Sequence, residues 1–238
     1  MKPEIKIFAT ISEIAEEFAS TLQTLASEAN GLSVHIALSG GSTPKAIFKY
    51  LTSHYGKSLA NTQFHFWWGD ERCVSPTDDD SNYKWANELW LSPIGIPQKN
   101  IHRVLGEDDP EKEAIRYAEE MEALLPFENG WPVFDLMLLG LGEDGHTASI
   151  FPHQIALISS EKLCEVATHP ESGQKRITIT GNVINNSRVI AFLSTGEKKA
   201  QKVYEIIKLK DKTLPATHIS PKNGKLVWLL NNEAAKQL

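Results

Sequence analysis

The sequence has too few cysteines for a fold that depends on them. Cys73 and Cys164 are the only two in 238 residues and lie far apart in the chain, which excludes a disulfide framework and a four-cysteine zinc site. No apolar run approaches the roughly 18 residues of a membrane span, and the first residues form no apolar leader segment. We therefore expect a cytoplasmic protein that does not enter a membrane.

Basic residues are also in short supply. The 24 lysines and arginines are outnumbered by 30 acids, which gives a formal net charge of -6. Nucleic-acid binding normally needs a basic surface that neutralises phosphates, so this balance argues against it and leaves room only for a local cationic pocket. Because the chain contains no repeat, low-complexity tract or linker, we expect one domain over residues 1–238, as a monomer or small homo-oligomer.

Apolar runs of strand length alternate with stretches of helical periodicity. This pattern predicts an α/β fold with an open, mainly parallel sheet flanked by helices, as in Rossmann-like proteins. Several of the runs are apolar throughout, as strands buried on both faces should be. Six strands are expected at residues 5–9, 34–38, 64–68, 134–140, 189–194 and 226–230.

Three helices show both a start signal and an apolar stripe. Ser12 is expected to cap the first, Asp109 and Pro110 to open the second, and Gly196 to precede the third. Their expected buried stripes are, in turn, Ile14, Phe18, Leu22 and Leu25; Ile115, Ala118, Met121 and Leu125; and Ala200, Val203, Tyr204 and Ile207.

The first motif that can bind a ligand runs from Ser39 to Pro44, directly after an expected strand. Its paired glycines let backbone approach an anion closely, and the N-terminus of the following helix adds unpaired N–H groups and partial positive charge. An ordinary helix cap, with Pro44 at the first helical position, is the alternative. The motif lacks the Gly-Lys-Ser/Thr ending of a P-loop, and Pro44 replaces the closing glycine of a nucleophile elbow.

A second motif places two acids beside an arginine at another strand's carboxyl end, where open α/β sheets form their ligand crevices. Asp70, Glu71 and Arg72 are either a functional ion cluster or an exposed turn of little energetic value. The acidic stretch 77–83 lacks the glycine and distal glutamate of a calcium loop, so we expect a solvated loop that caps a helix over residues 82–91, and no metal.

The third motif is a glycine-rich loop that carries an imidazole and two carboxylates after the buried strand near residue 140. His146 has the residue type whose pKa, ordinarily about 6.5, allows it to take a proton from water at neutral pH. A neighbouring carboxylate can orient the ring, and Asp144 is the candidate partner, with Glu143 as the other acid in the loop. The cluster predicts a general-base centre.

Two cations downstream complete the set of candidates. Arg176 lies in the segment Lys175–Thr180, and Lys199 lies in the first turn of the helix that follows Gly196. A cation near a helix N-terminus opposes the helix dipole unless an anion shares the site. These residues indicate a phosphate ligand, although solvated lysines on an amphipathic helix give the same pattern.

Taken together and in chain order, five segments resemble the 6-phosphogluconolactonases, which are related to the glucosamine-6-phosphate deaminases. The resemblance spans nearly the whole chain, and the continuation 147–152 is similar to the lactonases rather than the deaminases. The segments are Ser39–Pro44, Asp70–Arg72, Gly142–Ser149, Arg176–Thr178 and Gly196–Ala200.

The resemblance implies a sugar-phosphate isomerase/deaminase-like fold and a carboxylic ester hydrolase. The implied reaction is hydrolysis of 6-phospho-D-glucono-1,5-lactone to 6-phospho-D-gluconate in the oxidative pentose phosphate pathway, without metal or organic cofactor. His146 would activate water, Asp144 or Glu143 would hold it, and Arg72 would steady the lactone or its oxyanion. The implied substrate-binding residues are Ser39, Gly40, Gly41, Ser42, Thr43, Asp70, Arg176 and Lys199.

Two other functions fit the same segments. A glucosamine-6-phosphate deaminase or isomerase would use the same scaffold but release ammonia. A non-catalytic sugar-phosphate sensor would bind the ligand in the same pocket without accelerating lactone hydrolysis.

Overall fold

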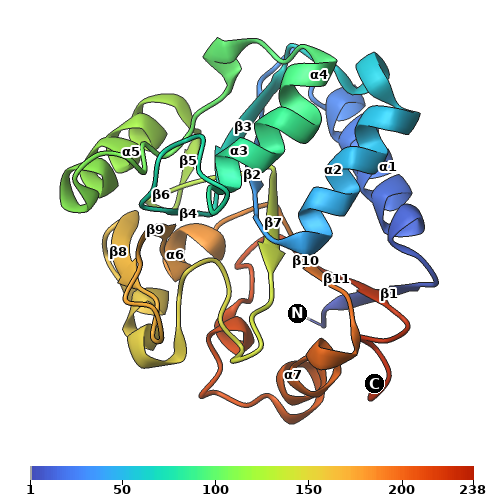
Figure 1. The fold of residues 1–238 in the computed structure, drawn as a ribbon, viewed down its shortest axis with the longest axis vertical. Coiled ribbons are helices and arrows are strands. Elements are labelled where there is room, and N and C mark those ends of the chain that lie inside the picture. Colours follow the sequence, from blue (N-terminus) through green and yellow to red (C-terminus); the bar gives the residue numbers. More distant parts are fainter. Residues whose placement is uncertain (1) are drawn as a thin grey trace.

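A six-stranded parallel sheet forms the centre of the molecule in the computed structural model, which describes residues 2–238 (Figure 1). The strand order is β1-β11-β10-β7-β2-β3. The bounds are β1 Glu4–Phe8, β2 Val34–Leu38, β3 Phe64–Trp68, β7 Leu136–Gly140, β10 Val189–Ser194 and β11 Lys225–Asn231. These are the six strands predicted from the apolar runs, so the predicted open parallel sheet is confirmed.

Alternate residues of the central strands face two separate hydrophobic cores. On β2, Ile36 and Leu38 join one core while Ala37 joins the other, and Met137 on β7 shares the core of Ala37. The period of two puts successive side chains on opposite faces of a sheet, so an apolar run with no polar alternation fits a strand covered on both sides.

Helices and short helical turns cover the sheet. In Figure 1, α1 and α2 lie side by side on one flank, and α5 lies on the opposite flank. The α-helices are α1 Ile11–Glu28, α2 Ser42–His54, α3 Asn82–Ala86, α4 Ser92–Ile94, α5 Pro110–Leu124, α6 Gly181–Ile184 and α7 Ala200–Tyr204. The remaining turns are η1 Gly56–Leu59, η2 Asn87–Leu91, η3 Gln98–Asn100, η4 Pro152–Ser159, η5 Glu197–Lys199, η6 Glu205–Leu209 and η7 Pro215–His218.

A second, antiparallel sheet was not predicted. It has the order β4-β9-β8, with bounds β4 Asp70–Arg72, β9 Lys175–Ile179 and β8 Cys164–Thr168, and a small hairpin pairs β5 Phe127–Glu128 with β6 Trp131–Pro132. Because only Gly69 separates the end of β3 from the start of β4, the chain passes from one sheet directly into the next. Within the described residues, no helix is both long and apolar enough to span a bilayer.

Three local predictions were wrong. Helix α1 is capped by Thr10, whose hydroxyl accepts from the backbone N–H of Glu13, rather than by Ser12. Helix α2 starts at Ser42, so Pro44 is not its first residue. Ile115 is 61% exposed, because α5 packs through Ala114 and Tyr117, together with the predicted Met121 and Leu125.

Other local predictions are confirmed. Asp109 caps α5 through the N–H of Lys112, 3.1 Å away. The expected helix over residues 82–91 is present as α3 followed by the π-turn η2, and Ser81 caps it. Cap residues satisfy N–H groups in the first helical turn, which is why such signals can be read locally.

The strand order places the carboxyl ends of β2 and β7 side by side. From β2 the chain continues to β3 on one side, while β7 pairs with β2 on the other, with Ile36 opposite Leu136. Open α/β sheets form ligand crevices at such a point, because connecting loops leave the sheet in opposite directions. The loops after β2 and β7 are the ones that carry the first and third sequence motifs.

Candidate functional site

A polar pocket of about 250 Å³ lies at the carboxyl ends of β2 and β7. Most of the candidates predicted from the sequence line it, although they come from segments far apart in the chain. The lining residues are Ser39, Gly40, Gly41, Asp70, Arg72, Asn82, Gly140, Leu141, Gly142, Glu143, His146, Ala148, Arg176 and Lys199. Three of the predicted residues are not among them. Asp144 lies behind His146, Ser42 lines a neighbouring cavity, and the Thr43 hydroxyl is 2.7 Å from that of Thr195.

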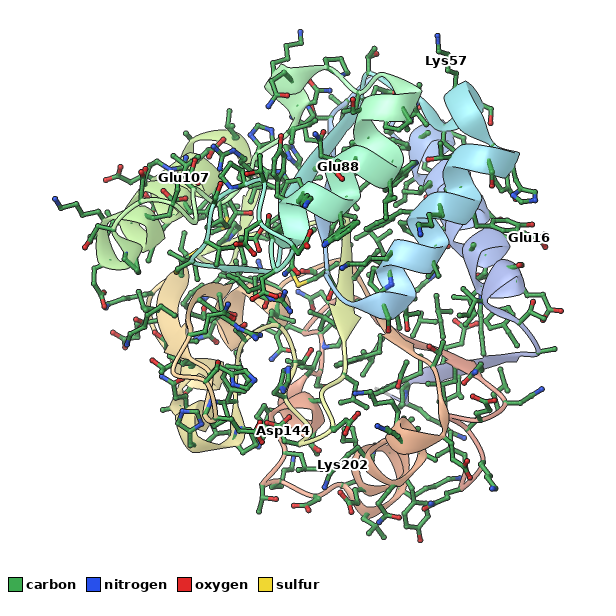
Figure 2. All side chains as sticks on the ribbon, in the orientation of Figure 1. Glu16, Lys57, Glu88, Glu107, Asp144 and Lys202 are labelled. Atoms are coloured by element: carbon green, nitrogen blue, oxygen red, sulfur yellow. The ribbon has the colours of Figure 1, made fainter. Side chains whose placement is uncertain are left out.

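The loop after β7 folds back on itself and thereby carries His146 to the pocket. The N–H of Gly142 donates to the carbonyl of His146 at 2.8 Å, and the hydroxyl of Thr147 donates to the carbonyl of Gly140 at 3.0 Å. Gly145 has a φ of +86°, a left-handed conformation that favours glycine. Figure 2 shows Asp144 on this loop, at the end distant from the strand.

Asp144 is the carboxylate that contacts the candidate base. Its Oδ1 lies 2.5 Å from His146 Nδ1 and also accepts from the backbone N–H of His146 at 3.1 Å, whereas Glu143 is exposed at the mouth of the pocket. Burial alone would raise the pKa of Asp144, but the hydrogen bond and charge of His146 bring it down to about 2. A carboxylate at Nδ1 favours the tautomer in which Nε2 is free to accept a proton.

Two arginines lie directly opposite each other on neighbouring strands of the second sheet. The antiparallel register pairs Arg72 of β4 with Arg176 of β9, and both line the pocket. Like charges directly opposite on a sheet are destabilising. Burial, followed by the charge of Arg72, lowers the pKa of Arg176. Among the described residues, neither Nε atom has a hydrogen-bond partner, although both are buried. The pair has the charge and free donors to hold an anion.

Lys199 adds a third positive charge. Burial lowers the pKa of its ammonium, while the nearby carboxylates of Glu143 and Asp144 act in the opposite direction. Lys199 is the last residue of the turn η5, and Gly196, which directly precedes that turn, has a φ of +93°. The pocket thus carries cations from three segments of the chain, as expected for a phosphorylated ligand.

The turn after β2 approaches the pocket through backbone rather than side chains. A Cβ at Gly40 would lie 1.7 Å from Asn82 Oδ1, and Gly41 has a φ of +106° immediately before α2. Glycine is therefore needed at both positions, one for space and one for conformation. The N-terminus of α2 opens beside this turn, where backbone N–H groups can receive an anion.

Glu71 supports the loop that presents Arg72 and Asn82. Its buried carboxylate accepts from the backbone N–H groups of Arg72, Asn82 and Tyr83, each at 2.7 Å, and from the hydroxyl of Ser81 at 3.0 Å. Burial raises the pKa of Glu71, and the three backbone hydrogen bonds oppose that change. Its environment indicates a structural role, not a catalytic one.

Sequence reasoning missed three contributors to the site. The pattern around Asn82 predicts only a helix start, and Ser149 and Phe151 read only as parts of the loop motif and its continuation. Phe151 is fully buried, with its ring centroid 4.7 Å from that of His146 and 5.5 Å from the guanidinium carbon of Arg176. For Ser149 and Phe151 the only sequence signal is their place in or beside the loop motif, and for Asn82 there is none.

No group of three or more His, Cys, Asp or Glu side chains suited to a metal ion occurs within residues 2–238. The hydroxyls, backbone N–H groups and cations of the pocket are instead donors, which suit a phosphate or carboxylate oxygen. Chemically, the arrangement combines an oriented imidazole with an anion-binding surface.

Comparisons with known proteins agree over nearly the whole chain. A 6-phosphogluconolactonase from Haemophilus influenzae is 45% identical over 96% of this chain and 95% of its own length. A solved devB protein superposes with a TM-score of 0.92 at 44% identity, covering 99% of both chains. The solved 6-phosphogluconolactonase of Trypanosoma brucei superposes with a TM-score of 0.87 at 30% identity, covering 100% of this chain and 99% of that one.

The family described as glucosamine-6-phosphate isomerases/6-phosphogluconolactonase matches residues 8–228. That match includes every residue predicted for the site, from the turn after β2 to Lys199. On this match and these relatives, the chain belongs to the glucosamine-6-phosphate isomerase/6-phosphogluconolactonase family.

Proposed function

We propose that this chain hydrolyses 6-phospho-D-glucono-1,5-lactone to 6-phospho-D-gluconate in the oxidative pentose phosphate pathway. The observation that carries the proposal is His146, which lines a pocket with three cations and has Asp144 2.5 Å behind its ring. A lactone ester needs an activated water, and a phosphorylated sugar needs positive charge away from the reacting carbonyl. The 6-phosphogluconolactonases among the relatives support the same reaction.

In the proposed mechanism, His146 takes a proton from water through Nε2 as the oxygen attacks the lactone carbonyl. Asp144 holds the ring by Nδ1 and stabilises the imidazolium that forms. Arg72 stabilises the oxyanion of the tetrahedral intermediate. When that intermediate collapses, the ring C–O bond breaks and the leaving alkoxide takes the proton back from the imidazolium, so the base is regenerated.

The phosphate is proposed to bind at the other end of the pocket. Arg176 and Lys199 provide charge, and the turn Ser39–Gly41 with the backbone N–H groups of Ser42 and Thr43 at the start of α2 provides donors. Asp70 accepts a hydroxyl of the sugar ring. Binding energy from the phosphate then places the reactive carbonyl beside the base. No metal or organic cofactor takes part in this scheme.

The direct test is a lactonase assay with freshly prepared 6-phosphogluconolactone, corrected for spontaneous hydrolysis. We expect the wild type to accelerate hydrolysis and His146→Ala to lose on the order of 10² to 10⁴ in rate while still binding 6-phosphogluconate. Unchanged turnover in that variant would remove His146 from the role of base. Ammonia release from glucosamine 6-phosphate without faster loss of lactone would instead identify a deaminase.

The phosphate assignment has its own test. Arg176→Ala and Lys199→Ala are expected mainly to raise KM for the phosphorylated lactone, because both cations bind the part of the substrate that does not react. Gluconolactone without a phosphate is the control substrate. Equal losses on both lactones would show that these residues do not recognise the phosphate.

A further inference from the structure

We infer that Ser149 is a positioning residue of the pocket: its buried hydroxyl fixes the Asp70 carboxylate and holds the base-bearing loop against the second sheet. The inference rests on the proposed lactonase function, because it assigns Asp70 and Arg176 to the substrate. Ser149 is not itself among the residues that line the pocket. It acts through residues that do.

The hydroxyl of Ser149 connects two charged groups of opposite sign. The hydroxyl donates to Asp70 Oδ2 at 2.6 Å, and its own oxygen accepts from Nη1 of the Arg176 guanidinium at 3.5 Å. Ser149 is fully buried, while Asp70 is 6% and Arg176 9% exposed. A hydroxyl has one donor and two acceptor sites, so it can serve a carboxylate and a guanidinium at once.

The backbone of Ser149 is fixed at the same place. Its N–H donates to the hydroxyl of Thr178 at 3.2 Å, and Thr178 is the residue directly opposite Asp70 in the β4–β9 ladder. Through these two hydrogen bonds, Ser149 attaches the loop that carries His146 to one rung of the sheet that carries both pocket arginines. Only Thr147 and Ala148 lie between Ser149 and His146, so fixing Ser149 also restrains the position of His146.

The hydrogen bond from Ser149 fixes the orientation of the Asp70 carboxylate. With Oδ2 occupied by the serine, Oδ1 is the oxygen available to a substrate hydroxyl. Without the serine, a buried carboxylate beside Arg176 would turn toward that guanidinium, since a charged group left without a partner in a low-dielectric site gains most from the nearest opposite charge. The arginine would then be less available to the phosphate, and substrate binding would weaken.

The first experiment measures kcat and KM of Ser149→Ala with fresh lactone, and the affinity for 6-phosphogluconate by calorimetry. A hydrogen bond to a charged group corresponds to a loss of about 10- to 100-fold in kcat/KM, and we expect most of it in KM. Ser149→Cys, which keeps a weak donor of similar size, should lose less. It also supplies a test if the alanine variant does not fold.

Thr180→Val is the matched control. Thr180 is also fully buried, and its hydroxyl donates to a backbone carbonyl, that of Lys162, at 2.7 Å outside the pocket. This variant removes a buried hydroxyl just beyond the same sheet, and we expect it to lower thermal stability while kcat/KM stays within about threefold of the wild type. A loss in Ser149→Ala no larger than that of the control would overturn the inference.

A double-mutant cycle with Asp70→Ala separates positioning from general support. If Ser149 acts through Asp70, adding Ser149→Ala to that variant should change product affinity little, by about threefold or less. Losses that multiply fully would contradict the inference. Because calorimetry reads binding without turnover, an enzyme that binds 6-phosphogluconate but hydrolyses no lactone would defeat the proposed function and still test the role of Ser149.

Discussion

The replacement Asp144→Asn tests the contact that the sequence left open. The attraction that holds the pKa of Asp144 at about 2 rather than 3.8 also stabilises the positive imidazolium that forms when His146 accepts a proton. At about 1.4 kcal/mol per pKa unit, full coupling would be roughly 2.5 kcal/mol. The carboxyl side chain is 40% exposed, and solvent screening reduces this value to about 1 to 1.5 kcal/mol. We therefore expect kcat to fall about tenfold.

The assay is initial-rate hydrolysis of fresh 6-phosphogluconolactone at saturation, with the spontaneous rate subtracted. Glu143→Gln is the comparison, since Glu143 is the adjacent acid of the same loop but is exposed and lies at the pocket mouth. Its kcat should stay within about threefold of the wild type, as for most surface changes. Full activity in Asp144→Asn, or a larger loss in Glu143→Gln, would refute the proposed orientation of His146.

Three further outcomes are expected. In Gly142→Ala the new Cβ would lie 2.1 Å from Nδ1 of His146, so the imidazole ring must move. We expect turnover to fall on the order of 10²-fold while circular dichroism shows an intact fold. A normal kcat would contradict this expectation. Tyr117→Phe removes a buried hydroxyl that accepts from the N–H of Trp68 at 2.9 Å and donates to its C=O at 3.0 Å. We expect the free energy of unfolding in urea to fall by about 1–3 kcal/mol. An unchanged unfolding midpoint would argue against this role of the hydroxyl. The pKa of Asp144 is lower in the folded protein than in the unfolded chain, so the ionised carboxylate stabilises the fold. This contribution is complete above the unfolded pKa of 3.8 and is lost as pH falls toward 2. The stability gap between wild type and Asp144→Asn should therefore shrink by about half near pH 3, and a gap independent of pH would rule out this linkage.

The main sheet could be predicted because its strands are buried on both faces. Such strands read as uninterrupted apolar runs, as in Leu136–Gly140, and they stand out from helical stretches without any knowledge of their neighbours. The antiparallel sheet could not be recognised in this way. Its strand Asp70–Arg72 is short and charged, and pairing across a hundred residues, not local pattern, makes it a strand.

Packing also decided the local features that were predicted wrongly. Met121 and Leu125 are buried as predicted, but Ile115 and Ala114 are both at helical spacing from Ala118 in the same stripe. Only the position of the neighbouring sheet determines that Ala114 is the one buried. In the same way, Thr10 and Ser12 are both suitable caps, and the path of the chain out of β1 selects Thr10.

The sequence by itself determined the chemistry of the site. The glycine pair after β2, the imidazole and acids after β7, and the downstream cations are recognisable because residue type and strand-end position are local properties. Only the tertiary structure decided their partners: Asp144 rather than Glu143 on His146, Arg72 opposite Arg176, and Ser149 on Asp70. Those contacts depend on strand register and on how one loop meets a second sheet, which follow from packing of the whole chain and not from any one segment.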